Sequence, residues 1–408
     1  MIFKKMLIGF FVLIFIFSAS VNVLSAEKVR VASECDISDL YEPIEASSTV
    51  EQIGQTLEIK AKSAILIEPK TGEVLYEMNS DQPSAPASIT KIMSLLLVME
   101  AIDENNLSLE DVVVASQHAS SMGGSQIWLE EGESMTVHDL LKAAVIASAN
   151  DATVALGEHI AGSEEGFVVL MNEKAKSLGM SNTHFVNATG LDAEGHISSA
   201  RDVAIMSAEL IKHPLIKNYS TVWMDTLRDG SSELVNTNKL VRFYEGTTGL
   251  KTGTTSNAGY CLSATAERDG MELVAVVMDG ETSNERFNAA KKLLDYGFAN
   301  FKFHKIEPEI PKNQTVAVKG GVEAEVNVEC KDAFGALLKK TDAVGISQSV
   351  FLPKSVKAPI KKGDVVGTVT VFNGDTELSV FEITAGEDVK KMSVSVAFLW
   401  VLRGLFTL

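Results

Sequence analysis

The sequence predicts an α+β protein in which helices flank one antiparallel sheet, followed by a small all-β domain. Two short strand patterns within residues 63–76 are joined by Lys70-Thr-Gly-Glu, which is typical of a β-hairpin. A second pair of strand patterns within residues 259–278 surrounds the turn sequence Arg268-Asp-Gly. Because strands lie at both ends of this region and helical patterns lie between them, we expect one sheet covered by helices.

Four stretches carry the apolar spacing of helices. One begins at Ser88, and a second covers residues 136–159. The second is interrupted at Ser148-Ala-Asn-Asp, because Asn and Asp favour local turns and caps. The other two helices are expected over residues 199–210 and 284–298.

The N-terminus has the pattern of a secretory signal peptide. Lys4 and Lys5 precede an apolar run over residues 6–17, and small residues follow at Ser25-Ala26. The run is shorter than the roughly 20 residues of a membrane-spanning helix. We therefore expect cleavage near Ala26 and export of the mature chain to the outer face of the cytoplasmic membrane, with an uncleaved membrane anchor as the alternative.

Changes in composition divide the remaining chain. Alternating strand patterns after residue 303, with Asn373-Gly374 between two of them, predict the all-β domain. The last stretch is apolar and aromatic and carries Lys390, Lys391 and Arg403, which fits a helix lying on an anionic membrane surface. A terminal strand or helix packed on the protein is the alternative. The expected segments are a signal peptide (1–26), a polar lead-in (27–60), the main α+β domain (61–303), the β domain (304–386) and the membrane-surface anchor (387–408).

Composition excludes several classes of function. The 408 residues carry a formal net charge of −18, which disfavours binding to nucleic acid. Three widely separated cysteines argue against a disulfide scaffold or a zinc site. The chain has no Gly-x-Ser-x-Gly, His-Glu-x-x-His or phosphate-binding Gly-x-x-x-x-Gly-Lys pattern. We therefore expect no metal and no cofactor.

The first candidate catalytic motif is Ser88-Ile-Thr-Lys91. Positions three apart lie on one face of a helix, so we expect the Lys91 amine beside the Ser88 hydroxyl. A serine hydroxyl needs a base to remove its proton, and a neutral lysine can be that base. Burial or a second nearby cation favours the neutral amine. By itself the motif is weak, since it occurs by chance in most long chains.

Two further motifs could complete the site. Ser148-Ala-Asn150 offers a hydroxyl that can relay a proton and an amide that can hold a substrate carbonyl. Lys251-Thr-Gly-Thr254 lies on a predicted strand, where Gly253 leaves room for a substrate against the strand edge. Lys251 can be the second cation, and the backbone N–H groups of Thr254 and Ser88 can form an oxyanion hole.

The order of the three motifs is the signature of penicillin-binding proteins and class A β-lactamases. The chain resembles the low-molecular-mass penicillin-binding proteins that are D-alanyl-D-alanine carboxypeptidases, over nearly everything after the signal peptide. The order of a β domain and a terminal membrane-binding helix is also similar. The matching blocks are Ala87-Ser-Ile-Thr-Lys-Ile-Met93, Ala147-Ser-Ala-Asn-Asp-Ala152, Ser198-Ser-Ala-Arg-Asp202, Gly249-Leu-Lys-Thr-Gly-Thr254 and Ala258-Gly-Tyr260.

The resemblance implies a serine acyl-enzyme. Ser88 would attack the peptide bond between the two terminal D-alanines of a peptidoglycan stem peptide, D-alanine would leave, and water would hydrolyse the ester. β-Lactam antibiotics would acylate the same serine. The implied roles are acylation base for Lys91, proton relay for Ser148, substrate amide contact for Asn150, carboxylate binding for Lys251 and Thr252, and substrate binding for Gly253, Thr254, Arg201 and Arg286. Structural ion pairs are the alternative for the two arginines.

One residue departs from the family pattern. The middle motif is usually Ser-Gly-Asn, and here Ala149 replaces the glycine. The hydroxyl and the amide remain, so we expect a changed rate rather than a loss of chemistry.

Three other functions compete with this interpretation. A class A β-lactamase needs a Glu-x-x-Leu-Asn loop, and Glu233-Leu-Val-Asn lies too close to Lys251 to supply it. A transpeptidase would use the same acyl-enzyme, and the sequence leaves that side activity open. A non-catalytic wall-binding or penicillin-sensing protein is disfavoured by the presence of both Ser88 and Lys91.

Overall fold

The computed structural model describes residues 29–30, 57–306, 310, 314–330, 334–341 and 345–398. The expected signal peptide and most of the lead-in lie outside these residues, as do the last ten residues of the expected anchor.

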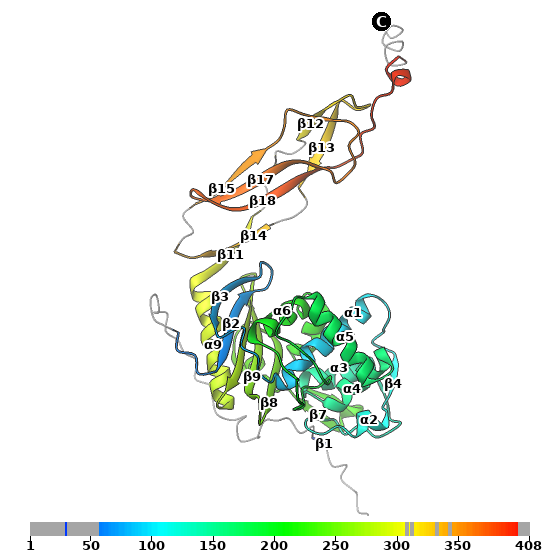
Figure 1. Cartoon of the computed structure of the whole chain (residues 1–408), viewed down its shortest axis with the longest axis vertical. Coiled ribbons are helices and arrows are strands. Elements are labelled where there is room, and N and C mark those ends of the chain that lie inside the picture. Colours follow the sequence, from blue (N-terminus) through cyan, green and yellow to red (C-terminus); the bar gives the residue numbers. More distant parts are fainter. Residues whose placement is uncertain are drawn as a thin grey trace, which may run out of the picture.

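A five-stranded antiparallel sheet forms the centre of the larger domain (Figure 1). The strand order is β3-β2-β10-β9-β8, so the first hairpin and the last strands of the domain meet in one sheet as predicted. Strand β8 lies at an edge of this sheet. The strands are β2 (Ser63–Glu68), β3 (Glu73–Met78), β8 (Thr247–Thr255), β9 (Gly259–Arg268) and β10 (Met271–Gly280).

Helices cover both faces of the sheet. Helix α9 packs on β9 and β10, and α6 packs on β10 and β2 from the other side (Figure 1). Side-chain caps mark the starts of α3, α5, α6 and α9, where Thr or Ser accepts a backbone N–H. The main helices are α1 (Lys91–Asp103), α3 (Val137–Ile146), α4 (Asn150–Ala161), α5 (Glu164–Ser177), α6 (Ala200–Leu210) and α9 (Ser283–Asn300).

Short elements connect these helices. The helical ones are η2 (Ala87–Thr90), α2 (Gln117–Ser120), η3 (Pro214–Ile216), α7 (Lys217–Ser220), η4 (Arg228–Gly230) and α8 (Leu240–Phe243). The strands are β4 (Val112–Val114), which pairs with β5 (Ser134–Thr136), and β1 (Val29–Arg30), β6 (Met224–Leu227) and β7 (Ser232–Val235), which form a sheet of order β1-β7-β6.

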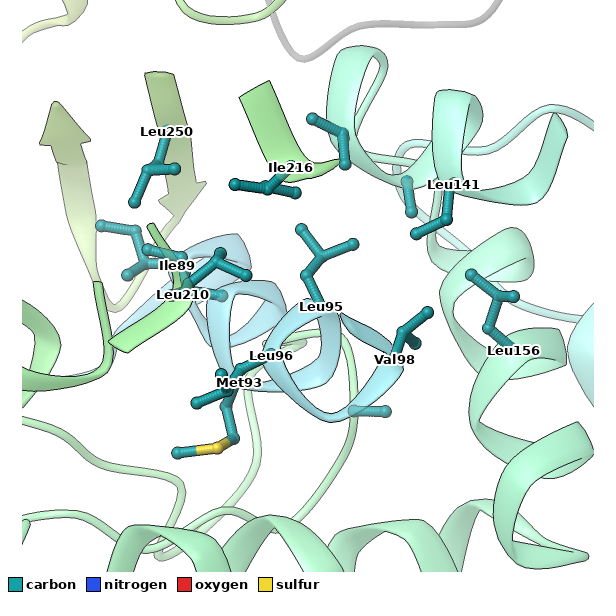
Figure 2. Close-up of a cluster of buried hydrophobic side chains, with 14 of the residues drawn as sticks. Ile89, Met93, Leu95, Leu96, Val98, Leu141, Leu156, Leu210, Ile216 and Leu250 are labelled. Carbon is teal, nitrogen blue, oxygen red and sulfur yellow. The ribbon is translucent and has the colours of Figure 1, made fainter. Parts of the chain in front are cut away.

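Helix α1 runs through the largest hydrophobic core. Apolar side chains are buried nearly all around it, which is the pattern of a central helix. Figure 2 shows Val98 on the side of Leu141 of α3 and Leu156 of α4, and Leu95 pointing toward Ile216. This packing fixes α1, and with it the turn that precedes it.

A small all-β domain follows α9. Strand β11 begins at the residue after α9 and pairs with β14, so the strand starts three residues before the expected boundary. The other strands form a six-stranded sheet of order β15-β17-β18-β13-β12-β16. The strands are β11 (Phe301–Ile306), β12 (Thr315–Lys319), β13 (Glu325–Glu329), β14 (Phe334–Lys339), β15 (Ile346–Phe351), β16 (Ser355–Lys357), β17 (Val365–Asn373) and β18 (Thr376–Ala385).

The predicted hairpin of this domain is present, with Asn373 opposite Thr376. The two turn residues are therefore Gly374 and Asp375 rather than Asn373 and Gly374. Residues 394–398 are helical, and within the described chain no helix is long and apolar enough to cross a bilayer.

Candidate active site

Ser88 lies in η2, a single 3-10 turn before α1, whereas the sequence predicts an α-helix that begins at Ser88. The turn is entered through Ala87, whose φ is 48°, and no side chain caps it. In 3-10 geometry the side chains at positions three apart eclipse one another. The turn therefore brings Ser88 and Lys91 together directly, and Lys91 Nζ lies 3.0 Å from Ser88 Oγ.

The Lys91 amine is enclosed by protein. Its side chain is 0% exposed, and Nζ also lies 2.9 Å from the carbonyl oxygen of Thr189. Removal of an amine from water favours its neutral form, which is the form that can accept a proton from serine.

The loop over residues 187–190 forms one wall of the site. The Asn187 side chain accepts the N–H of Gly190 (2.7 Å), and the Ser94 hydroxyl donates to the carbonyl of Ala188 (2.6 Å). Gly190 has a φ of 89°, and a Cβ built there would lie 1.8 Å from the carbonyl oxygen of Ala87. Only glycine lets this loop approach the Ser88 turn so closely.

Ser148 lies in the break between α3 and α4 that the sequence predicts. Its φ is 63°, and its buried Oγ has no hydrogen-bond partner among the described residues. An unpartnered buried hydroxyl on a left-handed backbone is costly, and such outliers concentrate at functional sites. Ala149 has an ordinary extended backbone with φ −61°, so its methyl group is accommodated without backbone strain.

Asn150 is oriented by the loop at residues 123–125. Its backbone N–H donates to the carbonyl of Ser125 (2.7 Å), and its Nδ2 donates to the carbonyl of Gly123 (2.6 Å). Its Oδ1 is buried without a hydrogen-bond partner in the described chain. Oδ1 can therefore accept a further hydrogen bond, and Nδ2 has a second hydrogen for the predicted contact to a substrate carbonyl.

Asp151 supports the same loop from inside the protein. Its buried carboxylate accepts the N–H groups of Ile127 and Leu129, each at 3.0 Å. Burial raises the pKa of this carboxyl group, and the backbone hydrogen bonds oppose the rise. The sequence analysis assigned Asp151 no role, although its place next to Asn150 was the available signal.

Strand β8 packs against the Ser88 turn. A Cβ on Gly253 would lie 3.0 Å from both the Ala87 side chain and the backbone nitrogen of Ile89. The space beside Gly253, which was predicted to receive a substrate, is filled by the turn itself. Gly253 therefore allows the third motif to reach the first.

The polar side chains of β8 are also held in place. Lys251 is almost fully buried, and its Nζ donates to the carbonyl of Thr252 (3.0 Å). The hydroxyl of Thr252 donates to that of Thr237 (2.7 Å). Strand β8 lies at the edge of the sheet and pairs with β9 on one side. Among the described residues, its other side has no partner strand within this sheet.

The two arginines differ in their placement. Arg286 is buried behind β8, where Nη1 donates to the carbonyl of Gly253 (3.0 Å) and to the Thr254 hydroxyl (2.8 Å). Arg201 donates hydrogen bonds to Glu77, Ser80 and Asp81 at the end of β3. Within the described residues, none of the three motifs hydrogen-bonds to Arg201.

His196 is a residue that the sequence analysis missed. It is 4% exposed, and its ring lies 2.8 Å from the hydroxyl of Thr90, inside the turn between Ser88 and Lys91. Burial lowers the pKa of His196 to about 4, with a smaller contribution from the nearby His184. Its place two residues before the Ser198-Ser-Ala-Arg-Asp202 block was the only signal available in the sequence.

Comparisons with known proteins agree with this geometry. A family model described as D-alanyl-D-alanine carboxypeptidase matches residues 48–282, and one described as penicillin-binding protein 5, C-terminal domain, matches residues 298–391. The chain belongs to the D-alanyl-D-alanine carboxypeptidase family. It is 45% identical over 339 residues to the D-alanyl-D-alanine carboxypeptidase DacF of Bacillus subtilis, an alignment that covers 81% of this chain and 86% of the relative.

Solved structures give the same result. Penicillin-binding protein 5 from Haemophilus influenzae is similar with a TM-score of 0.72 and 31% identity, over 83% of this chain and all of that one. Penicillin-binding protein D2 from Listeria monocytogenes in its ampicillin-bound form is similar with a TM-score of 0.53 and 36% identity, over 60% of this chain and all of that one. The protein is thus a serine-type D-Ala-D-Ala carboxypeptidase that binds penicillins and acts on peptidoglycan. The predicted family, fold class and activity are confirmed.

Gly190→Ala should slow acylation by about 100-fold or more, because the new Cβ would push the Ser88 turn or its neighbouring loop out of place. The measurement is the rate of covalent labelling by a fluorescent penicillin. Gly179→Ala is the matched control, since Gly179 also has a positive φ (75°) but its Cβ would meet no atom within 4 Å. Equal labelling rates for the two variants would contradict the steric argument.

Because burial lowers the pKa of His196, the free energy of unfolding should decrease as the pH falls below about 6.5. The unfolded histidine has a pKa near 6.5, so the unfolded chain takes up a proton first as the pH falls. This contribution to the free energy of unfolding is complete above about pH 6.5 and is lost toward pH 4, by roughly 3 kcal/mol at most.

Urea denaturation at pH 7, 6, 5 and 4 measures this loss, with His196→Gln as the comparison because glutamine does not titrate. As the pH falls from 7 to 4, the free energy of unfolding of the wild type should decrease more than that of the variant. A difference that is constant from pH 7 to pH 4 would show that His196 titrates normally in the folded state.

Proposed function

We propose that Ser88 is the nucleophile of this carboxypeptidase and that Lys91 is the base that activates it. The observation that carries the proposal is the 3.0 Å separation of Ser88 Oγ and Lys91 Nζ in a buried turn. Ser88 Oγ would attack the carbonyl carbon between the two terminal D-alanines while its proton passes to Lys91 Nζ.

Ser148 and Asn150 would serve the departure of D-alanine and the orientation of the peptide. The Ser148 hydroxyl, which has no partner in the described chain, is free to pass the proton from Lys91 to the leaving nitrogen. The open Oδ1 of Asn150 would accept an N–H of the stem peptide. Water would then hydrolyse the ester at Ser88, with the same base activating it.

Strand β8 would bind the substrate backbone and its carboxylate. An extended peptide can add to an edge strand through main-chain hydrogen bonds. The N–H groups of Ser88 and Thr254 would hold the developing oxyanion, and Lys251 with Thr252 would bind the terminal carboxylate. Arg286 acts in this proposal as a support of β8, and Arg201 as an anchor of α6 to the end of β3.

Ser88→Ala should abolish D-alanine release from diacetyl-Lys-D-Ala-D-Ala, by a factor of roughly 10⁴ or more, because no other group can form the ester. Peptide mapping after labelling by a fluorescent penicillin should place the label on Ser88 in the wild-type protein. Lys91→Ala should slow both reactions while leaving the fold intact by circular dichroism.

Absence of D-alanine release from the wild-type protein would exclude the proposed roles and favour the wall-binding or penicillin-sensing alternative. A label on another serine would exclude Ser88 as the nucleophile.

We also propose that the enzyme works on the outer face of the cytoplasmic membrane and is held there by its C-terminal segment. Residues 389 and 391 of that segment are bridged to the β domain, whereas residues 394–398 are helical and carry exposed apolar side chains, with Val394 at 89% and Phe398 at 64%. Exposed apolar residues beside Lys390 and Lys391 suit the boundary of an anionic bilayer.

A chain that ends at Met392 should therefore lose its affinity for vesicles that contain phosphatidylglycerol, because the apolar residues that enter the headgroup region are removed. Cosedimentation of the mature and shortened proteins with these vesicles measures the effect. D-alanine release in solution is the control and should be equal. Equal cosedimentation would exclude this segment as the anchor.

A further inference from the structure

The buried imidazole of His196 connects two segments that are far apart in sequence. The backbone N–H of Val186 donates to its Nδ1 at 2.9 Å, and its Nε2 lies 2.8 Å from the hydroxyl oxygen of Thr90. Both nitrogens of a side chain that is almost fully removed from water are therefore used. A satisfied buried polar group of this kind specifies a single arrangement of its partners.

The hydrogen bonds determine which nitrogen carries the proton. A backbone N–H can only donate, so Nδ1 must be the unprotonated acceptor. In the neutral ring Nε2 then carries the hydrogen and donates it to the Thr90 hydroxyl oxygen. Burial, which lowers the pKa of His196 to about 4, keeps the ring in this neutral form at pH 7.

The two connected segments are those that hold Lys91. Thr90 precedes Lys91 in the same 3-10 turn as Ser88. Val186 leads into the loop at residues 187–190, whose Thr189 carbonyl lies 2.9 Å from Lys91 Nζ. The imidazole thus spans from the main chain that carries Lys91 to the loop that contacts its amine.

The segment that carries His196 is itself fixed. Its neighbours on the C-terminal side are bridged to other parts of the fold, Ile197 to His184 and Ser198 to Ser84. The ring also packs against Phe185, with centroids 5.8 Å apart. Because these contacts fix both the segment and the ring, the imidazole can hold Thr90 and Val186 at a fixed separation.

We propose that His196 is a positioning residue that sets the distance between Ser88 Oγ and Lys91 Nζ by bracing the catalytic turn against the 187–190 loop. This inference rests on the proposed roles of Ser88 and Lys91. His196 touches neither reacting atom, and it acts through Thr90 and Val186. Its loss should therefore lower the acylation rate constant and leave the affinity of the first, non-covalent complex nearly unchanged.

The test compares three variants of the mature protein with the wild type. His196→Ala removes both hydrogen bonds. His196→Gln keeps the pattern, because its Oε1 can accept from Val186 while its Nε2 donates to Thr90. Ser207→Ala is the matched control, since Ser207 is also buried and its hydroxyl is hydrogen-bonded elsewhere, to the Val203 carbonyl (2.6 Å) and the Ser263 hydroxyl (2.8 Å).

Stopped-flow acylation by a fluorescent penicillin separates the dissociation constant of the first complex from the acylation rate constant. His196→Ala should lower the rate constant about tenfold or more with a dissociation constant within about twofold of the wild type, as expected for loss of orientation. His196→Gln should restore most of the rate. Ser207→Ala should lower the melting temperature without changing either constant.

A second readout is the imidazole ¹⁵N spectrum of the wild-type protein, which should show the Nε2–H tautomer of His196 at pH 7. The inference is overturned if His196→Ala acylates at the wild-type rate, if only its melting temperature changes, or if the other tautomer is found. These results leave Ser88 labelling intact. Failure of the proposed function would instead appear as no labelling of Ser88 in the wild-type protein.

Discussion

The contact between Ser88 and Lys91 is the constraint around which the larger domain is arranged. Two side chains three positions apart are held 3.0 Å from each other in a 3-10 turn that no local cap stabilises. The turn is kept by its surroundings, since β8 presses on it at Gly253 and the 187–190 loop presses on it at Gly190. Both approaches need a residue without a side chain, and helix α1 anchors the turn in the main hydrophobic core (Figure 2).

Burial of Lys91 makes the contact with Ser88 chemically useful, because it favours the neutral amine that can accept a proton. Lys91 and Lys251 are among the largest fully buried side chains of the described chain, although a charged lysine is costly to take out of water. The protein also leaves buried polar atoms without a hydrogen-bond partner in the described chain, on Ser148 and Asn150 of the second motif. The free-energy cost of these buried polar groups is offset by favourable packing elsewhere in the fold, here by a continuous hydrophobic core and by helices with capped N-termini.

Local sequence patterns predicted the helices, strands and turns. The geometry of the catalytic turn depends on contacts between residues far apart in the chain, which local patterns do not show. The two hairpins, the break at Ser148 and the turn near Asn373 follow from short-range turn chemistry, and the structure has them. The 3-10 form of the Ser88 turn was not predictable, because the elements that impose it lie about 100 and 165 residues away in the chain. His196 was missed for the same reason, since its role is visible only from Thr90 and Val186 together.

The strand order also determines at which stage of synthesis and folding the active site can form. Strand β2, near the start of the domain, pairs with β10, some 200 residues later, and β8 joins the sheet through β9 (Figure 1). During synthesis from the N-terminus, the residues around Ser88 are therefore made long before the strands that shape their turn. Pairing of such distant segments is slow, because loop closure must precede the contacts that stabilise it. A partly made chain consequently has a serine and a lysine but no reactive centre, and the domain can neither hydrolyse a stem peptide nor be acylated by an antibiotic until its sheet is complete.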